Sequence, residues 1–245
     1  MRPKIAVVVA QGEIAAGDLP AGVVGGISTS NLLREAREDD AVHAVVLRVN
    51  SPGGGVFPSE QIRREVELTR AAGKPVVVSM GDLAASGGYW ISMNADKIYA
   101  QPSTITGSIG IFGLFMTFPE TLSKLGVNVD GVGTTKMAGA FDPTRPISED
   151  VSIAVQAIID QGYRQFIGKV AEARNSTPEK IDEVARGRVW SGAQAESFGL
   201  VDALGGLTDA ISDAAVRANL PEDGYAVVYV EKELSPFETL LVDMA

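Results

Sequence analysis

Short, nearly continuous runs of apolar residues recur through the first part of the chain. They cover Ile5 to Val9, Ala44 to Val49, Pro75 to Met80 and Lys97 to Ala100. Runs of this length without polar alternation are typical of strands that are covered on both faces, as in parallel sheets. Segments with helical spacing lie between them, at Thr29 to Arg37, at Ser59 to Ala72 and from about Ser86 onwards. The alternation predicts an α/β fold with a mostly parallel sheet and surrounding helices.

The carboxyl-terminal part of the chain has a different pattern. Apolar residues recur at helical spacing from Val151 to Val170, directly after the capping residue Ser148. Further helices are predicted from Pro178, at Ala193 to Phe198 and at Leu207 to Ala218, and a last strand at Ala226 to Val230. The region is therefore predicted to be mostly helical. We expect one domain over residues 1–230 and a tail over residues 231–245.

Composition narrows the possible functions. The 245 residues carry a formal net charge of −10, whereas nucleic acids and anionic membrane surfaces attract proteins with clustered lysine and arginine. Cysteine is absent, which excludes disulfides, thiolate nucleophiles and thiolate metal sites. The longest apolar stretch, Ile109 to Phe118, has about half the length that spanning a bilayer requires. We expect no nucleic-acid partner, no metal and no cofactor.

A single histidine limits the catalytic options. His43 precedes the predicted strand Ala44 to Val49, where a surface position explains it more simply than catalysis does. A histidine-based triad would have to use this one residue. A serine enzyme with this sequence therefore needs a different base.

A glycine-rich segment follows the second predicted strand directly. It reads Asn50-Ser51-Pro52-Gly53-Gly54-Gly55. Successive glycines allow positive φ angles and leave amide hydrogens uncovered, which suits the binding of an oxyanion. A flexible turn explains the same residues equally well, because a glycine loop alone is weak evidence of function.

A second motif follows the third predicted strand. Ser86 stands after Ala84-Ala85 and before Gly87-Gly88, at the predicted start of a helix. There the amide hydrogens and the helix dipole favour developing negative charge, as a nucleophilic hydroxyl requires. Composition alone favours the simpler role of a helix N-cap, which serine often fills.

Several segments taken together resemble a known family. They are Val45 to Gly55, Ala84 to Ser92, Ser103 to Ile111, Arg188 to Gly192 and Gly199 to Asp202. These residues are similar to signal peptide peptidase A, also called protease IV, of peptidase family S49, and to the carboxyl-terminal half of its long form. The resemblance implies the Clp protease and crotonase fold, a serine–lysine dyad, and substrates that are cleaved signal peptides and other short hydrophobic peptides.

The resemblance also assigns roles to residues. Ser86 corresponds to the nucleophile, and the backbone amides of Gly54 and Gly87 to the oxyanion hole. Ser108, in Thr106-Gly107-Ser108-Ile109-Gly110, matches a hydroxyl that hydrogen-bonds the catalytic lysine. An ordinary strand or turn serine is the alternative at that position.

The general base has two candidate sources. A lysine acts as a base only when burial lowers its pKa toward neutrality, and Lys136 lies among glycine, threonine, methionine and alanine. It is also the position that matches the family's lysine. In the long form, however, two homologous halves occur in tandem and the first supplies the lysine. Solvated positions are expected for Lys4, Lys74, Lys169, Lys180 and Lys232. Lys136 and a lysine from a missing amino-terminal repeat both remain open.

The resemblance also implies an assembly and a location in the cell, and two other functions remain as alternatives. Its members form homo-oligomeric rings and are anchored in the bacterial inner membrane, facing the periplasm; a cytoplasmic location is the alternative. A crotonase-type acyl-CoA hydratase or isomerase would share the fold but would use acidic residues for proton transfer. A non-catalytic scaffold subunit of a larger peptidase is the third interpretation, favoured if Lys136 is exposed.

Overall fold

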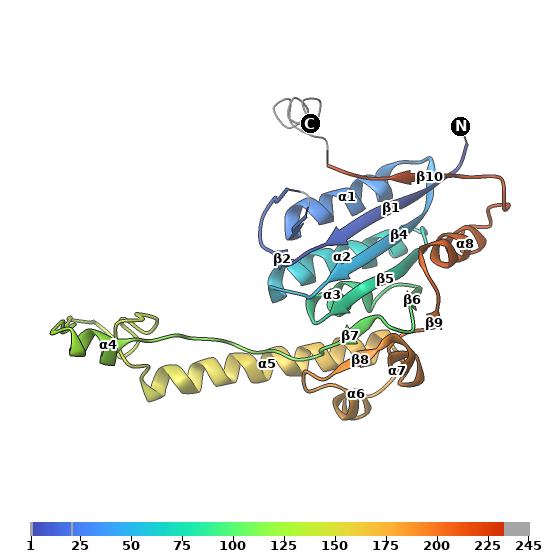
Figure 1. Ribbon diagram of the computed structural model, residues 1–245. Coiled ribbons are helices and arrows are strands. Elements are labelled where there is room, and N and C mark those ends of the chain that lie inside the picture. The colour runs from blue at the N-terminus through green and yellow to red at the C-terminus, as the bar shows by residue number, and fades with distance from the viewer. Residues whose placement is uncertain (1, 21, 233–245) are drawn as a thin grey trace.

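The computed structural model describes residues 2–20 and 22–232, and its centre is a sheet (Figure 1). The strands are β1 (Lys4–Gln11), β2 (Ile14–Ala15), β3 (Val24–Gly25), β4 (Val42–Ser51), β5 (Val76–Ala85), β6 (Lys97–Ala100), β7 (Ile105–Gly107), β8 (Val189–Ser191), β9 (Ala203–Leu204) and β10 (Ala226–Tyr229). The helices are α1 (Gly26–Glu38), α2 (Val56–Ala71), α3 (Gly87–Ser92), α4 (Pro119–Lys124), α5 (Glu149–Ala173), α6 (Pro178–Val184), α7 (Gly192–Ser197) and α8 (Leu207–Arg217).

The main sheet has the strand order β10-β1-β4-β5-β6-β9, and every pair along this path is parallel. Strand β7 pairs with the carboxyl-terminal end of β5, and β8 runs antiparallel to β7. The carboxyl ends of β4 and β5 therefore meet at one edge, beside β7. In open α/β sheets this edge is where loops bearing functional residues gather.

Both faces of the sheet are covered, which explains its uninterrupted apolar strands. In β1, Ala6 and Val8 belong to a core shared with α1, α2 and α3, whereas Ile5 and Val7 belong to a second core shared with α8. Side chains alternate between the two faces of a strand, so a strand buried on both sides needs apolar residues at every position. The predicted mostly parallel α/β architecture is confirmed.

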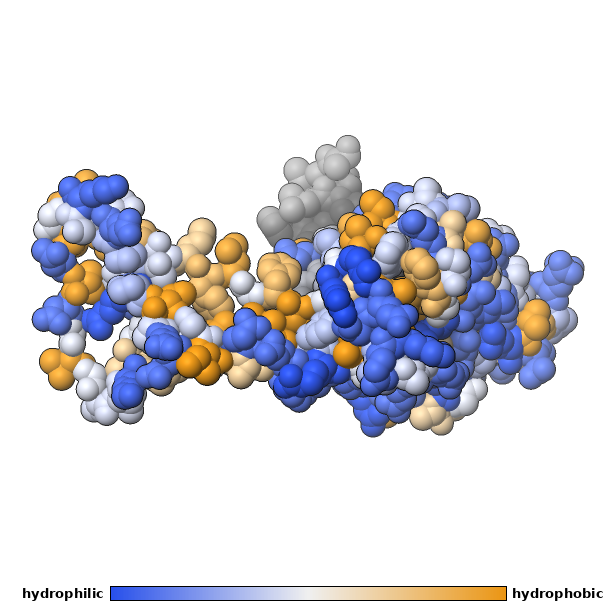
Figure 2. Space-filling view, turned by 90° about the horizontal axis from the view of Figure 1, so that it is seen from below, coloured by the Kyte–Doolittle hydropathy of each residue, from blue (hydrophilic) through white to orange (hydrophobic). Residues whose placement is uncertain are grey.

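Residues 112–158 form an arm that extends away from the rest of the protein, which we call the body (Figure 1). An extended chain leads outward to α4, and α5 returns to the body. Large apolar side chains of the arm are exposed, with Phe112 at 88% and Leu114 and Met116 at 77%. Figure 2 shows apolar side chains along this part of the molecule. Exposed apolar surface of this extent marks contacts with other molecules.

The helical carboxyl-terminal region also agrees with the prediction. Ser148 caps α5 by accepting a hydrogen bond from the Val151 amide, and Thr177 caps α6 with Pro178 at its first position. Among the described residues, none of the helices combines the length and apolarity that crossing a bilayer demands. Of the predicted tail, residues 233–245 lie outside the described part of the chain.

Candidate active site

Ser86 stands between β5 and α3 in an unusual backbone conformation. Its φ and ψ angles are 54° and −116°, a region that residues with a Cβ atom rarely occupy. Two backbone hydrogen bonds hold it: the Ser86 amide donates to the Gly107 carbonyl at 2.9 Å, and the Trp90 amide donates to the Ser86 carbonyl at 2.9 Å. The hydroxyl does not cap α3. Ser86 therefore occupies the N-cap position without the side-chain hydrogen bond that would explain a serine there.

The predicted glycine loop lies directly against Ser86. Gly53 and Gly54 have φ angles of 102° and 153°. A Cβ atom on Gly53 would lie 2.8 Å from the Ser86 Cβ, and one on Gly54 would lie 2.0 Å from the Ile14 carbonyl oxygen. Both positions thus require glycine, because their φ angles are positive and because neighbouring atoms leave no room for a Cβ atom. Gly55 has ordinary angles and is the N-cap of α2.

Two backbone amides beside Ser86 have no acceptor among the residues that the structure describes. Around Gly54, the hydrogen bonds with Ile14 use the Gly53 carbonyl at 2.8 Å and the Gly55 amide at 2.9 Å, which leaves the Gly54 amide free. Gly87 is the first residue of α3, where an amide has no partner within the helix. A Cβ placed on Gly87 would lie 3.1 Å from the Gly54 nitrogen, so the two residues adjoin.

A cleft of about 870 Å³ opens in front of Ser86. It is lined by Glu13, Pro52, Gly53, Gly54, Ser86, Ser108, Gly110, Ile111, Phe112, Ile159, Asp160, Tyr163, Arg186 and Gly187. Five described non-glycine residues have positive φ, and three of them, Ser86, Ser108 and Arg186, line this cleft. Residues with strained backbone angles cluster at functional sites, where the surrounding structure holds them in place.

A smaller pocket of about 60 Å³ leads from Ser86 into the body. Its walls are Gly54, Val56, Ser59, Ser86, Gly87, Trp90, Gly110, Ile111, Phe112 and Phe166. Apart from the serine hydroxyls and backbone groups, the lining is apolar. A cavity of about 150 Å³ accommodates benzene, so this pocket suits an aliphatic side chain of a few carbons.

The rim of the cleft carries an ion pair that the sequence did not indicate. Arg186 pairs with Asp182, and the Tyr163 hydroxyl donates to Asp182 at 2.5 Å. Hydrogen bonds from Arg186 and Tyr163 lower the pKa of Asp182 to about 2. Tyr163 is on α5, Asp182 is on α6 and Arg186 is in the turn between α6 and β8, so no local motif beside Ser86 could have identified them.

The structure brings together most of the predicted site but not the lysine. Ser86, Gly54, Gly87 and Ser108 adjoin one cleft, whereas His43 is exposed near the amino end of β4. Lys136 belongs to the segment between α4 and α5. This segment lies at the outer end of the arm (Figure 1). Its side chain is 88% exposed and lies 3.8 Å from Asp150. Within a single chain, Lys136 is in a solvated and charged setting rather than the apolar one expected from its neighbours in sequence.

Solved structures share this fold. A membrane-bound stomatin-specific protease, 1510-N, in complex with a substrate peptide, has a TM-score of 0.57 at 14% identity, with 99% of this chain and 98% of that chain covered. ClpP1 of Listeria monocytogenes has a TM-score of 0.51 at 16% identity, with 84% and 94% covered. At these identities the likeness establishes the fold alone. The chain has the predicted Clp protease fold.

Sequence comparisons are more specific. Protease 4 of Salmonella typhi is 52% identical over 89% of this chain, and a putative signal peptide peptidase SppA of Enterococcus faecium is 36% identical over 78%. The chain spans 35% of the length of the first relative and 55% of the second. The family model for peptidase family S49 matches residues 69–221, which include Ser86, Ser108 and Lys136. The chain therefore belongs to peptidase family S49.

Proposed function

We propose that this chain is a serine peptidase whose nucleophile is Ser86. The observation that carries the proposal is the strained Ser86 at the mouth of α3, facing a large cleft with its hydroxyl unused as a helix cap. A structural N-cap would have no reason to hold positive φ, since serine caps helices from the extended region. Strain at this residue is explained if it aims the hydroxyl at a bound substrate.

The free amides beside Ser86 would stabilise the reaction. When the Ser86 Oγ attacks a peptide carbonyl, its proton passes to a base and the carbonyl oxygen becomes an oxyanion. The Gly54 and Gly87 amides would donate to that oxygen, and their lack of another acceptor among the described residues supports this role; the amino end of α3 would add to the stabilisation. Expulsion of the amine, which takes up the proton, leaves an acyl group on Ser86, and water then releases it.

The base is a lysine, and we assign it to Lys136 of another polypeptide. Within its own chain the Lys136 side chain is exposed and near Asp150, rather than in the dry, apolar setting that a lysine base requires. Insertion into the cleft of a neighbouring chain would remove water from the amine and supply that setting. Ser108 lines that cleft and would accept a hydrogen bond from the incoming amine. The neighbour that would supply Lys136 is a second copy of this chain. A lysine of a homologous amino-terminal repeat is the alternative base, and the apolar arm supports assembly with either neighbour.

The substrates are short hydrophobic peptides, including signal peptides after their cleavage. The small aliphatic pocket and the apolar side chains Ile111, Phe112 and Ile159 in the cleft support this class. The arrangement of the cleft allows an extended peptide to lie across Ser86 with one side chain in the small pocket. The Enterococcus relative carries the name of a signal peptide peptidase.

Replacement of Ser86 tests the nucleophile. Ser86→Ala should abolish peptide cleavage and labelling by a serine-directed phosphonate, while the unfolding temperature stays close to that of the wild type. Cleavage retained by the alanine variant would refute the assignment. If the phosphonate does not label the wild type under the conditions used for the peptide-cleavage assay, Ser86 is not an activated nucleophile. A different reaction, such as that of a crotonase-type hydratase or isomerase, would then be favoured.

A mixing experiment tests the origin of the base. Ser86→Ala and Lys136→Met should each be inactive alone and should regain activity when assembled together, because one chain then supplies the serine and the other the lysine. Lys124→Met, an exposed lysine on the same arm, is the matched control and should remain active. Full activity of Lys136→Met would exclude Lys136 and favour the separate repeat.

A non-catalytic scaffold is the second candidate, favoured by the exposure of Lys136. In that role the cleft would bind peptides without cleaving them. Peptide binding by the wild-type chain, with neither turnover nor Ser86 labelling in any assembly, would support the scaffold.

A further inference from the structure

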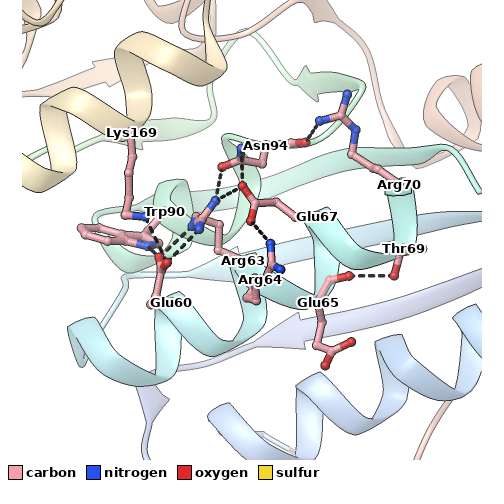
Figure 3. Close-up of polar contacts among 10 residues, drawn as sticks. All are labelled: Glu60, Arg63, Arg64, Glu65, Glu67, Thr69, Arg70, Trp90, Asn94 and Lys169. Atoms are coloured by element: carbon pink, nitrogen blue, oxygen red, sulfur yellow. Dashed lines mark hydrogen bonds and ion pairs between the residues drawn. The ribbon is translucent and has the colours of Figure 1, made fainter. Parts of the chain in front are cut away.

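A polar cluster that includes Glu60 adjoins the small pocket through Trp90, which lines that pocket (Figure 3). One Glu60 carboxylate oxygen accepts hydrogen bonds from the Trp90 indole at 2.8 Å and from Arg63 Nε at 2.7 Å. The other accepts from Arg63 at 2.7 Å and from the Lys169 Nζ at 3.1 Å. Glu60 and Arg63 are on α2, Trp90 is on α3 and Lys169 is on α5. A single carboxylate thus joins three helices.

Two aromatic side chains form part of the wall of the pocket, and one of them is the Trp90 that Glu60 holds. Trp90 and Phe166 both line it, and their ring centroids are 4.3 Å apart with the planes inclined by 43°. Trp90 is also tied to the nucleophile, because its amide donates to the Ser86 carbonyl. Phe166 lies one helical turn before Lys169 on α5, so the ion pair to Glu60 fixes the part of α5 that carries the phenyl ring.

Glu60 itself has little freedom to move. Arg63, with a side chain only 6% exposed, is held further by Asn94 at 3.0 Å and by Glu67. Burial alone would raise the pKa of Glu60, but hydrogen bonds from Arg63, Trp90 and Lys169 outweigh it and lower the pKa to about 2. The carboxylate therefore stays ionised at neutral pH, with its hydrogen-bond geometry set by a buried guanidinium.

We propose that Glu60 is a positioning residue that sets the size of the substrate side chain accepted beside Ser86, by holding Trp90 directly and Phe166 through Lys169. The inference rests on the proposed peptidase function. Glu60 does not line the pocket and so acts on specificity only through the two aromatic rings. A pocket of about 60 Å³ excludes large side chains only while both rings stay in place.

The expected effect is a loss of discrimination. In a hydrophobic pocket one methylene changes kcat/KM by roughly 10-fold to 200-fold. Release of the wall should slow the cleavage of substrates with a small side chain and admit larger ones. Weakened folding alone would lower the rate for all substrates together, so the ratio between substrates distinguishes positioning from a general structural role.

The test uses peptides that differ only in the residue whose carbonyl Ser86 attacks, with alanine, leucine or phenylalanine there. In Glu60→Gln the alanine-to-phenylalanine ratio of kcat/KM should fall by about tenfold or more relative to the wild type. Lys169→Met, which frees α5 but leaves the Trp90 bond, should lower the ratio less. Both are measured in the assembly in which the wild type is active.

A matched pair of controls lies elsewhere in the body. Lys4 pairs with Asp39 at 3.0 Å, with the lysine side chain 32% exposed as in Lys169. Lys4→Met and Asp39→Asn remove an equivalent ion pair at the amino end of β1 and should leave the ratio unchanged. A ratio in Glu60→Gln equal to that in the controls would overturn the inference.

Tryptophan fluorescence gives a readout that does not depend on turnover. The chain has two tryptophans, so Trp190→Phe leaves Trp90 as the single emitter. Glu60→Gln in this background should shift the Trp90 emission, and Asp39→Asn should not. A wild type that neither cleaves peptides nor labels at Ser86 would defeat the proposed function. Wild-type cleavage together with unchanged specificity and emission in Glu60→Gln would defeat this inference alone.

Discussion

Replacement of Ser86 by glycine should make the protein inactive and more stable. The φ of 54° and ψ of −116° are easy for glycine but cost a residue with a Cβ atom about 1–3 kcal/mol. Against this, glycine loses about 0.4–1 kcal/mol more conformational entropy on folding. The net stabilisation is about 1 kcal/mol relative to Ser86→Ala, which keeps the Cβ and hence the strain.

The comparison between the two inactive variants isolates the strain, because both lack the hydroxyl. In thermal unfolding Ser86→Gly should melt roughly 2–4 °C above Ser86→Ala. Asn175→Gly is a suitable control: Asn175 does not line the cleft, and asparagine tolerates its φ of 49°, so little change is expected. A Ser86→Gly variant no more stable than Ser86→Ala would show that the Ser86 backbone is not strained, and would remove the main support for Ser86 as the nucleophile.

Two further perturbations have definite outcomes. Gly54→Ala should lower kcat/KM by about 100-fold or more and should also reduce the free energy of unfolding. The reason is that the new Cβ would lie 2.0 Å from the Ile14 carbonyl oxygen, at a φ of 153°. Peptide kinetics measure the first effect and urea unfolding measures the second. The pKa of Glu60 is lowered on folding to about 2, so the stability it contributes is full above its ordinary value of 4.5 and is lost as the pH falls toward 2. Unfolding temperatures followed between pH 6 and pH 2.5 should therefore drop less steeply in Glu60→Gln than in the wild type; parallel curves would contradict this.

The sequence alone predicted the fold well, because its signals are local. Uninterrupted apolar runs such as Ala44 to Val49 specify strands covered on both faces, and Ser148 and Thr177 mark helix starts by their own hydrogen bonds. The sequence also allows the prediction that Ser86 lies beside the glycine loop. Both segments directly follow strands that are neighbours in a parallel sheet, so they meet at the same edge of the sheet.

The remaining parts of the site depend on contacts between segments distant in sequence. Lys169 was expected to be solvated, yet it pairs with Glu60, a residue 109 positions earlier. Lys136 has apolar and hydroxyl-bearing neighbours in sequence, but α4 and α5 carry it outward to an exposed loop. Local sequence patterns do not indicate where the side chains of a long helix lie in the folded protein. They also do not indicate which residues of another chain would contact Ser86.

The pairing of β1 with β10 has a consequence for how the protein is made. Lys4 is in register with Ala226, so the sheet cannot be completed until nearly the whole described chain has left the ribosome. At about 5–20 residues per second, the apolar edge of β1 waits roughly 10–40 s for its final strand. An unpaired edge of this kind invites association with other nascent chains. We therefore expect expression at lower temperature, or with chaperones that shield strand edges, to raise the yield of soluble protein.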